Sequence, residues 1–348
     1  MVNPLRSIFD LLAARKTSGM AGTSAYRAKL AQEHARYKDM ADVNALPPIF
    51  HYWSHTYLRP MVEEFDVRHP DEWFANHLHE SAVRTGTDRP RFISIGAGNC
   101  DTEVRVAKLL RQKGLDGFVI ECLDLNTHML ARGRELAKAE GVQSNVGFVE
   151  GDFNRWRADG RYDGVMASQS LHHVMALEDL FDEVRRALHP TGMFVISDII
   201  GRNGHMRWPE ALDDVQRFWQ EMPTEYRYNR LLSRHEETYE NWDCSDEGFE
   251  GIRAQDILPT LLERFEFYKF IGFANVIDPF IDRAFGHNFN ADAEWDRAFI
   301  DRIHQLDEAG FADGRLKPTH MFAALTLSEP PQRQYSRGLS PEACVRTA

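Results

Sequence analysis

The segment Arg91–Asp101, RFISIGAGNCD, decides the fold class of this chain. Its first five residues are mostly apolar, as in a buried strand, and glycines follow at 96 and 98. Glycines at the end of a first strand permit a tight turn and let the backbone approach a ligand closely. A helical pattern begins at Thr102. Many α/β folds share this strand, glycine loop and helix, so the segment alone predicts a fold class and no particular ligand.

Strands and helices continue to alternate after this segment. Such alternation favours a mostly parallel sheet with helices on both faces. Helices are predicted near 102–113, 128–139 and 177–188. Seven strands are predicted at 91–95, 118–125, 145–151, 162–168, 192–200, 265–273 and 320–327.

Four regions are expected along the 348 residues. Residues 1–88 are predicted to form a helical cap or lid, with an ordered loop at HYWSHTYLRP (51–60). Residues 89–200 form the parallel-sheet core. Residues 201–328 carry a helical insert, near 205–242, and the closing strands, and we expect substrate selection there. The tail at 329–348 is low in apolar residues and is expected to be disordered.

Composition narrows the functional class. The net charge of −12 argues against a protein that mainly grips a phosphate backbone. The four cysteines show no CxxC spacing, which fits a reduced intracellular setting. No apolar run is as long as a membrane span, and the first residues lack the pattern of a signal peptide. We therefore expect a cytoplasmic enzyme without a nucleic-acid or membrane partner.

The glycine loop disfavours a dinucleotide. A dinucleotide fingerprint has a third glycine where this chain has Asp101, and a carboxylate there would repel a pyrophosphate. Beside a ligand with a sulfonium and an ammonium group, the same carboxylate is neutral or helpful. A plain helix cap explains Asp101 equally well.

Two further acids follow the next strands. Asp124 ends the second strand, where adenosine-binding α/β folds place an acid that accepts both ribose hydroxyls. A cap on the next helix is the alternative for Asp124. Asp152, after Gly151, is suited to an adenine amino group, with Phe153 covering the ring, although a Gly-Asp pair is also a common turn.

The ordered motifs carry a family resemblance over about residues 90–200. They resemble those of class I S-adenosylmethionine (SAM)-dependent methyltransferases, whose fold is a seven-stranded, mostly parallel Rossmann-like sheet. The resemblance implies SAM as cofactor, with the methionine part at the glycine loop, the ribose at Asp124 and Leu125, and adenine at Asp152 and Phe153. It also implies Ser168 and Gln169 at the amino-acid end, and Gly96, Ala97, Gly98 and Asp101 in the loop. The motifs are ISIGAGNCD, ECLDLN…ML, FVEGDF, YDGVMASQSLHHV and ALHPTGMFVISD.

Two positions depart from the family pattern. The family often has an acid where this chain has Ser94, and a third glycine where it has Cys100. Both replacements are small residues, so the fold prediction is unchanged. They leave undetermined which groups contact the methionine part of the cofactor.

The reaction that the resemblance implies needs little chemistry from the protein. Methyl transfer from a sulfonium is an in-line displacement, in which the enzyme holds the acceptor opposite sulfur and excludes water. His172 and His173 follow the fourth strand and are candidates for positioning the acceptor or removing its proton. Hydrogen bonds to the backbone are the alternative role. No metal is expected, because we see no ligand spacing and Asp198 stands alone in sequence.

Acceptor binding has weaker candidates. Tyr57 and Arg59 lie in the aromatic stretch and suit a lid, although such aromatics more often pack a helical cap. Arg227 would suit a carboxylate or phosphate of the acceptor, with surface ion pairing as the stronger alternative.

A small-molecule methyltransferase is therefore the leading hypothesis. The alternatives are a methyltransferase acting on protein or nucleic acid, a silent SAM-binding module, and an NAD-dependent oxidoreductase. The helical N-terminal region is also a candidate surface for a homodimer.

Overall fold

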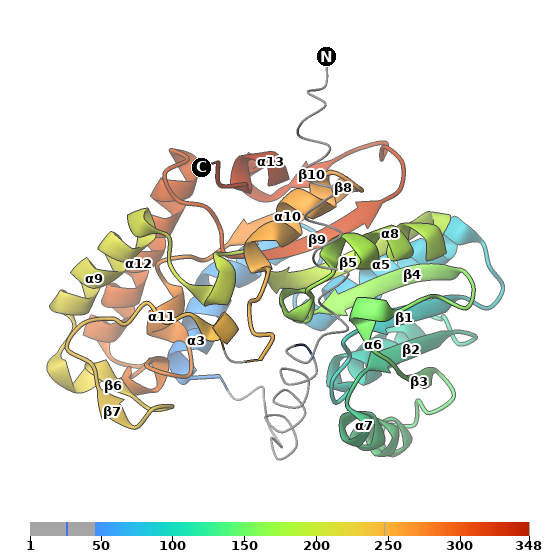
Figure 1. Ribbon diagram of the computed structural model, residues 1–348, viewed down its shortest axis with the longest axis horizontal. Coiled ribbons are helices and arrows are strands. Elements are labelled where there is room, and N and C mark those ends of the chain that lie inside the picture. The colour runs from blue at the N-terminus through green and yellow to red at the C-terminus, as the bar shows by residue number, and fades with distance from the viewer. Residues whose placement is uncertain (1–25, 27–45, 247, 348) are drawn as a thin grey trace.

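The computed structural model describes residue 26 and residues 46–246 and 248–347. Its centre is an eight-stranded sheet in the order β10-β8-β9-β5-β4-β1-β2-β3 (Figure 1). β9 runs antiparallel to β5 and β8, and the other pairs are parallel, which confirms the predicted α/β class. The strands are β1 (Arg91–Ile95), β2 (Val119–Asp124), β3 (Val146–Glu150), β4 (Tyr162–Ser168), β5 (Leu188–Ile199), β8 (Glu266–Phe273), β9 (His320–Thr326) and β10 (Gln334–Tyr335).

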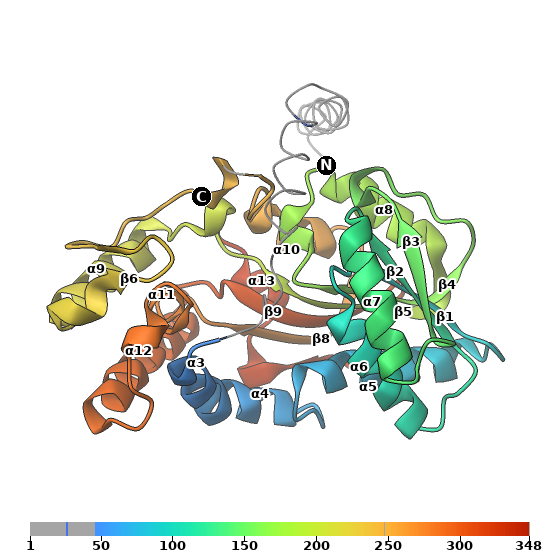
Figure 2. The same cartoon turned by 90° about the horizontal axis from the view of Figure 1, so that it is seen from below.

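Helices cover both faces of this sheet. Neighbouring residues of a strand point to opposite faces, so Val165 and Met166 of β4 belong to different apolar clusters. Figure 2 shows α5 and α6 below the strands and α8 and α10 above them. The Met166 face is packed by α5 (Pro70–Thr85), α6 (Asp101–Gln112) and α7 (Thr127–Ala139), and the Val165 face by α8 (Leu177–Ala187) and α10 (Ala254–Leu262).

A further group of helices lies beside the sheet, at the left in Figure 1. Phe218, Phe280 and Phe299 come from three of these helices and meet edge to face, with ring centroids 5.6, 5.7 and 6.3 Å apart. These aromatic contacts join segments that are far apart in the sequence. The group contains α3 (Pro48–Trp53), α9 (Pro209–Glu221), α11 (Asp278–Ile281) and α12 (Glu294–Ala312).

Two predictions about local structure were wrong. The stretch 51–60, predicted as a loop, is helical, and α3 continues there into η1 (Ser54–Leu58) and α4 (Arg59–Glu63). The insert predicted as helical over 205–242 contains one long helix, α9, followed by a hairpin of β6 (Tyr228–Asn229) and β7 (Arg234–His235). The predicted helical positions before residue 46 lie outside the described residues, apart from Tyr26.

The short helical turns are η2 (Phe153–Arg155), η3 (Leu171–His173), η4 (Asn203–His205), η5 (Thr224–Arg227), η6 (Cys244–Asp246) and η7 (Gly286–Asn288).

The tail predicted to be disordered is ordered and adds the eighth strand. β10 pairs with β8, with Tyr335 opposite Phe270 and its ring edge-on to the Phe270 ring. The chain then forms η8 (Ser336–Gly338) and α13 (Pro341–Cys344), and the Cys344 side chain is buried. A few buried side chains therefore order a segment whose average composition is polar.

None of the helices described is both long enough and apolar enough to cross a membrane.

Candidate cofactor and acceptor site

The loop between β1 and α6 can be built only with small residues. Gly96 has φ +69°, and a Cβ added there would lie 2.6 Å from Cβ of Ser170. Gly98 has φ +54°, and Cys100 occupies the place of the third glycine with φ +61°. L-residues rarely adopt this left-handed backbone. The loop therefore keeps the turn of a three-glycine motif with a buried cysteine at its third position.

An acid from α6 meets Ser94 beneath this loop. Ser94 Oγ donates to Oε1 of Glu103 at 2.6 Å, and both side chains are buried. Burial raises the pKa of Glu103 to about 7. A buried carboxyl group therefore lies against Ser94, and the motif comparison missed it.

Asp124 ties the glycine loop to the end of β2. Its carboxylate accepts from the N–H of Gly98 at 2.8 Å and from the N–H of Asn126 at 2.7 Å. The side chain of Asn126, rather than that of Asp124, caps α7. Leu125 between them is partly buried against the apolar cluster that contains Val165. Asp124 therefore lies at the glycine loop, as the ribose role requires.

Tyr26 reaches the third acid from the N-terminal region. Its hydroxyl donates to Oδ2 of Asp152 at 2.7 Å, and Oδ1 of Asp152 accepts from the N–H of Asn154 at 2.9 Å. The ring of Tyr26 is buried and packs on Phe249, with centroids 5.4 Å apart. Phe153 is almost fully buried beside Gly96. Sequence reasoning did not single out Tyr26 or Phe249.

The remaining predicted cofactor residues lie along the same edge of the sheet. Asp101 is the first residue of α6, so it follows the cap position that Cys100 occupies. Ala97 donates its N–H to the carbonyl of Leu123. Ser168 ends β4, and Gln169 turns away from it with φ +53° and donates from Nε2 to Ser197 Oγ.

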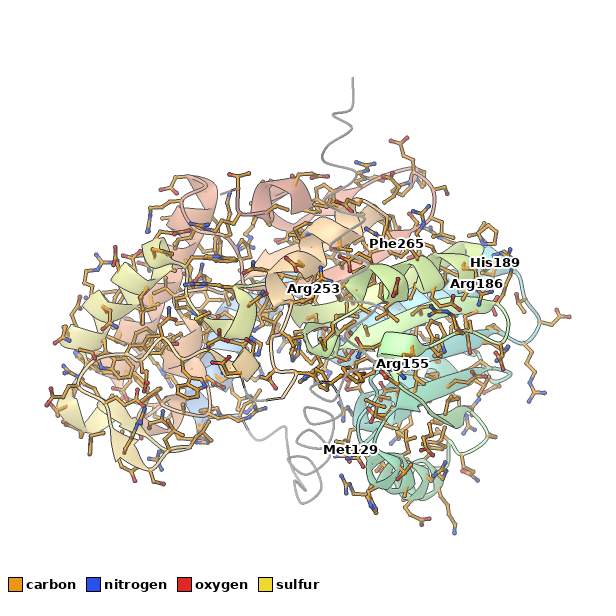
Figure 3. The ribbon with its side chains drawn as sticks, in the orientation of Figure 1. Met129, Arg155, Arg186, His189, Arg253 and Phe265 are labelled. Carbon is orange, nitrogen blue, oxygen red and sulfur yellow. The ribbon has the colours of Figure 1, made fainter. Side chains whose placement is uncertain are left out.

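Figure 3 shows how the side chains around this edge are arranged. Met129, Arg155 and Arg253 lie on the side that faces the middle of the molecule, whereas Arg186 and His189 lie at the opposite end. A Cβ on Gly98 would lie 3.6 Å from Cε of Met129, which places Met129 against the glycine loop.

His172 is anchored by Asp198. Nδ1 of His172 lies 2.6 Å from Oδ1 of Asp198, and both side chains are buried. The other carboxylate oxygen accepts from the N–H groups of Ser170 and Leu171, at 2.9 and 2.7 Å. Asp198 stands alone in the sequence, but it holds the whole loop that carries the histidine pair. The isolation of Asp198 in the sequence gave no sign of these contacts.

Glu250 gathers three histidines around one carboxylate. Nε2 of His205 lies 2.8 Å from Oε1 of Glu250, Nε2 of His172 lies 3.4 Å from the same oxygen, and Nε2 of His173 lies 3.9 Å from Oε2. His172, His173 and Glu250 form a group whose ligand atoms lie within 4.8 Å of one another, a candidate metal-ligand set that spacing along the sequence did not indicate. The set is not apparent in the sequence because Glu250 comes from a separate segment, as does His205, which contacts the same carboxylate.

The charges of this cluster shift the pKa values of its histidines in opposite directions. Burial lowers the pKa of His172, but the charges of Asp198 and Glu250 and their hydrogen bonds outweigh it and raise the pKa to about 10. Burial and the charge of His172 lower the pKa of His173 to about 3. Burial raises the pKa of Glu250, but its histidine partners hold it well below the usual range. With a carboxylate at each nitrogen, His172 is held protonated and does not serve as a general base; only a ligand that displaces the Nε2 proton would bind that nitrogen's lone pair.

The predicted acceptor residues are engaged elsewhere. Tyr57 donates its hydroxyl to Asp301 at 2.7 Å, and Arg59 forms an exposed ion pair with Glu63 at 2.7 Å. Arg227 donates to backbone carbonyls, including that of Met222 at 2.9 Å. Each of these three side chains therefore has a structural partner.

The comparison with family models agrees with this geometry. Residues 95–196 match the model described as "Methyltransferase domain". They include the glycine loop, both acids after β2 and β3, and the histidine pair. Residues 95–196 are a class I SAM-dependent methyltransferase domain. The matched segment is shorter than the sheet, and the N-terminal region and the insert lie outside it.

Curated relatives match the same part of the chain. A sterol 24-C-methyltransferase from Gibberella zeae is 28% identical over 127 residues, which cover 36% of this chain and 32% of that protein. A ubiquinone/menaquinone biosynthesis C-methyltransferase from Pseudomonas fluorescens is 30% identical over 125 residues, 36% of this chain and 46% of that protein. The chain therefore spans less than half the length of either relative. A solved structure titled as a putative sarcosine dimethylglycine methyltransferase from Galdieria sulphuraria covers 81% of this chain and 97% of its own, with 18% identity and a TM-score of 0.44.

Proposed function

We propose that this protein transfers the methyl group of SAM to a small molecule by in-line displacement. One observation carries the proposal: the glycine loop, Asp124 and Asp152 lie at the ends of three adjacent parallel strands of a methyltransferase domain. In open α/β sheets, ligands bind outside the carboxyl ends of the strands.

The residues of the site would each contact a different part of SAM. Gly96 and Gly98 let the methionine part approach the backbone, and Asp124 accepts the ribose hydroxyls with the lone pairs that its two backbone contacts leave available. Asp152 accepts the adenine amino group, and the ring of Phe153 covers the base. Ser168 and Gln169 face the amino-acid end. Bound SAM supplies an electrophilic methyl group on a sulfonium.

We assign the positioning of the methyl acceptor to His172 and His173. Because η3 follows β4 directly, His172 and His173 lie next to the predicted site of the amino-acid end of SAM. Asp198 holds their loop at a fixed position, so their role is to position the acceptor. We expect a small acceptor, because relatives that share this domain are named for sterol and quinone substrates. The suggestion of an anionic acceptor depended on Arg227. That guanidinium donates to backbone carbonyls instead, so we do not propose an anionic acceptor.

Binding and product formation test this function separately. Calorimetry should find that the purified protein binds SAM and its demethylated product and does not bind NAD. Labelled SAM incubated with a metabolite pool should then yield a labelled small molecule. Tight NAD binding without SAM binding would overturn the proposal, and SAM binding with label found only in protein or nucleic acid would favour a macromolecular acceptor. SAM binding without any labelled product would favour the silent module.

A further inference from the structure

Four potential metal ligands converge beside the predicted position of the methyl group. The Nε2 atoms of His172, His173 and His205 all face the carboxylate of Glu250, at 3.4, 3.9 and 2.8 Å. In a tetrahedral zinc site, a Zn–N distance near 2.0 Å puts neighbouring ligand atoms about 3.3 Å apart. The ligand atoms of His172, His173 and Glu250 lie within 4.8 Å of one another, which is close to the spacing of a metal site, and His205 reaches the same carboxylate.

The outer partner of one histidine, His172, also matches a metal site. Histidine ligands usually donate their other ring N–H to a carboxylate, which orients the ring and leaves one nitrogen for the metal. Asp198 does this for His172: it faces Nδ1 at 2.6 Å, so Nε2 points to Glu250. Asp198 is fully buried and also accepts from the N–H groups of Ser170 and Leu171. It is therefore a rigid support for one ligand.

Backbone strain supports the same assignment. His205 has φ +57°, and it follows Gly204, which has φ +65°. A side-chain-bearing residue in the left-handed region costs energy and persists where the surrounding structure holds it, often at functional sites. The strained turn delivers the imidazole of His205 to Glu250.

We propose that His172, His173, His205 and Glu250 bind a divalent transition-metal ion, which in turn binds an oxygen atom of the acceptor. Imidazole and carboxylate donors suit zinc, iron and manganese, whereas magnesium prefers oxygen ligands and bound water. The second part of this proposal rests on the proposed methyl transfer. It narrows the acceptor class to molecules with a hydroxyl or enol group.

Such an ion would activate the acceptor without a basic side chain. A hydroxyl bound to a divalent ion loses its proton more readily, and that proton leaves to solvent. A lone pair of the oxygen then forms the new O–CH3 bond. The electrons of the broken S–CH3 bond return to sulfur, so the sulfonium becomes a neutral thioether.

The main alternative is a metal-free charge cluster in which histidines and carboxylates only neutralise one another. Metal titration separates the two. Protein treated with a chelator and dialysed should bind one equivalent of Zn²⁺ per chain by calorimetry. His173→Ala and Glu250→Gln should each weaken Zn²⁺ binding at least tenfold. His189→Ala is the matched control, because His189 is only partly buried and lies at the far end of the sheet (Figure 3).

Cobalt gives a second readout that does not depend on activity. The visible absorption of bound Co²⁺ should appear in the unaltered protein and should be lost or shifted in His205→Gln, which also serves if another variant unfolds. Absence of Zn²⁺ and Co²⁺ binding, or equal binding by the unaltered protein and the cluster variants, would overturn the metal site. SAM binding is measured without metal in the same samples. Failure of SAM binding with metal binding intact would instead count against the methyltransferase function.

Discussion

The hydroxyl of Tyr26 donates to Asp152 at 2.7 Å, across 126 positions of the chain. Asp152 is the residue proposed to accept the adenine amino group. The hydroxyl of Tyr26 and the amino group of the cofactor would therefore compete for the same carboxylate. The buried ring of Tyr26, against Phe249, also covers this corner of the site. The contact places Tyr26 at the predicted cofactor site.

Tyr26→Phe separates these two roles. The ring stays, and the hydroxyl that occupies Asp152 is removed, so we expect SAM to bind roughly twofold to tenfold more tightly, the equivalent of one neutral hydrogen bond. Calorimetry measures the change. Tyr26→Ala is the comparison, because it also removes the ring and should weaken binding relative to Tyr26→Phe. Unchanged or weaker SAM binding in Tyr26→Phe would contradict competition at Asp152.

Asp124→Ala should weaken SAM binding at least tenfold, about 1.4 kcal/mol or more. The variant loses the acceptor for the ribose hydroxyls and also frees the N–H of Gly98 from its anchor. Glu150→Ala is the matched control, because Glu150 ends the neighbouring strand β3 and is exposed. Thermal unfolding checks that both variants fold. Equal SAM affinity in folded Asp124→Ala would remove Asp124 from the site.

Glu103 should make stability depend on pH. Its pKa is raised from 4.5 to about 7 in the folded protein. The folded state therefore binds the proton more strongly, and this contribution is fully present below pH 4.5 and is lost as the pH rises through 7. Glu103→Gln keeps an acceptor for Ser94 without the charge. We expect it to be more stable than the unaltered protein at pH 8, by up to roughly 3 kcal/mol, and little different near pH 5.

Urea unfolding at the two pH values measures this difference. Asp307 is buried and its pKa is also raised to about 7, so it adds the same pH trend to both proteins and cancels in the comparison. A pH-independent difference between Glu103→Gln and the unaltered protein would mean that charge burial at Glu103 is not the cause.

Asp198→Asn should lower turnover roughly tenfold to a hundredfold, the usual effect of losing a partner that orients a site histidine. SAM affinity should change much less, because Asp198 supports η3 and not the glycine loop. Asp182→Asn is the control, since Asp182 is an exposed acid on α8 that pairs with Arg264. The kcat and the SAM dissociation constant are measured for both variants. Normal turnover in a folded Asp198→Asn variant would exclude this positioning role.

The sheet could be predicted from sequence because its signals are local. β1 and β4 begin and end where apolar runs and turn residues predicted, and β2, β3, β8 and β9 differ from the prediction by about one residue at either end. β5 begins earlier than predicted, at Leu188, because that residue already pairs with Tyr162 of β4. The glycine loop and the acids that follow β2 and β3 are also local signals.

The acceptor side could not be predicted, because its residues meet only in the folded chain. Glu250 lies 77 and 78 positions after His173 and His172, on a loop that carries no motif of its own. Glu103 sits at a helical position where an exposed charge is the ordinary expectation, and only packing shows that it faces Ser94. The prediction that Tyr57 and Arg59 bind the acceptor failed for the same reason. An aromatic segment does not show which part of the chain its helix will pack against.

The pairing of β10 with β8 has a consequence for shortened forms of the protein. Without residues 329–348, the backbone groups of β8 around Lys269 and Phe270, which β10 now pairs, would meet water beside the ring of Phe270. Such an open strand is a template for pairing between molecules. Removal of the polar tail is therefore expected to favour association between molecules.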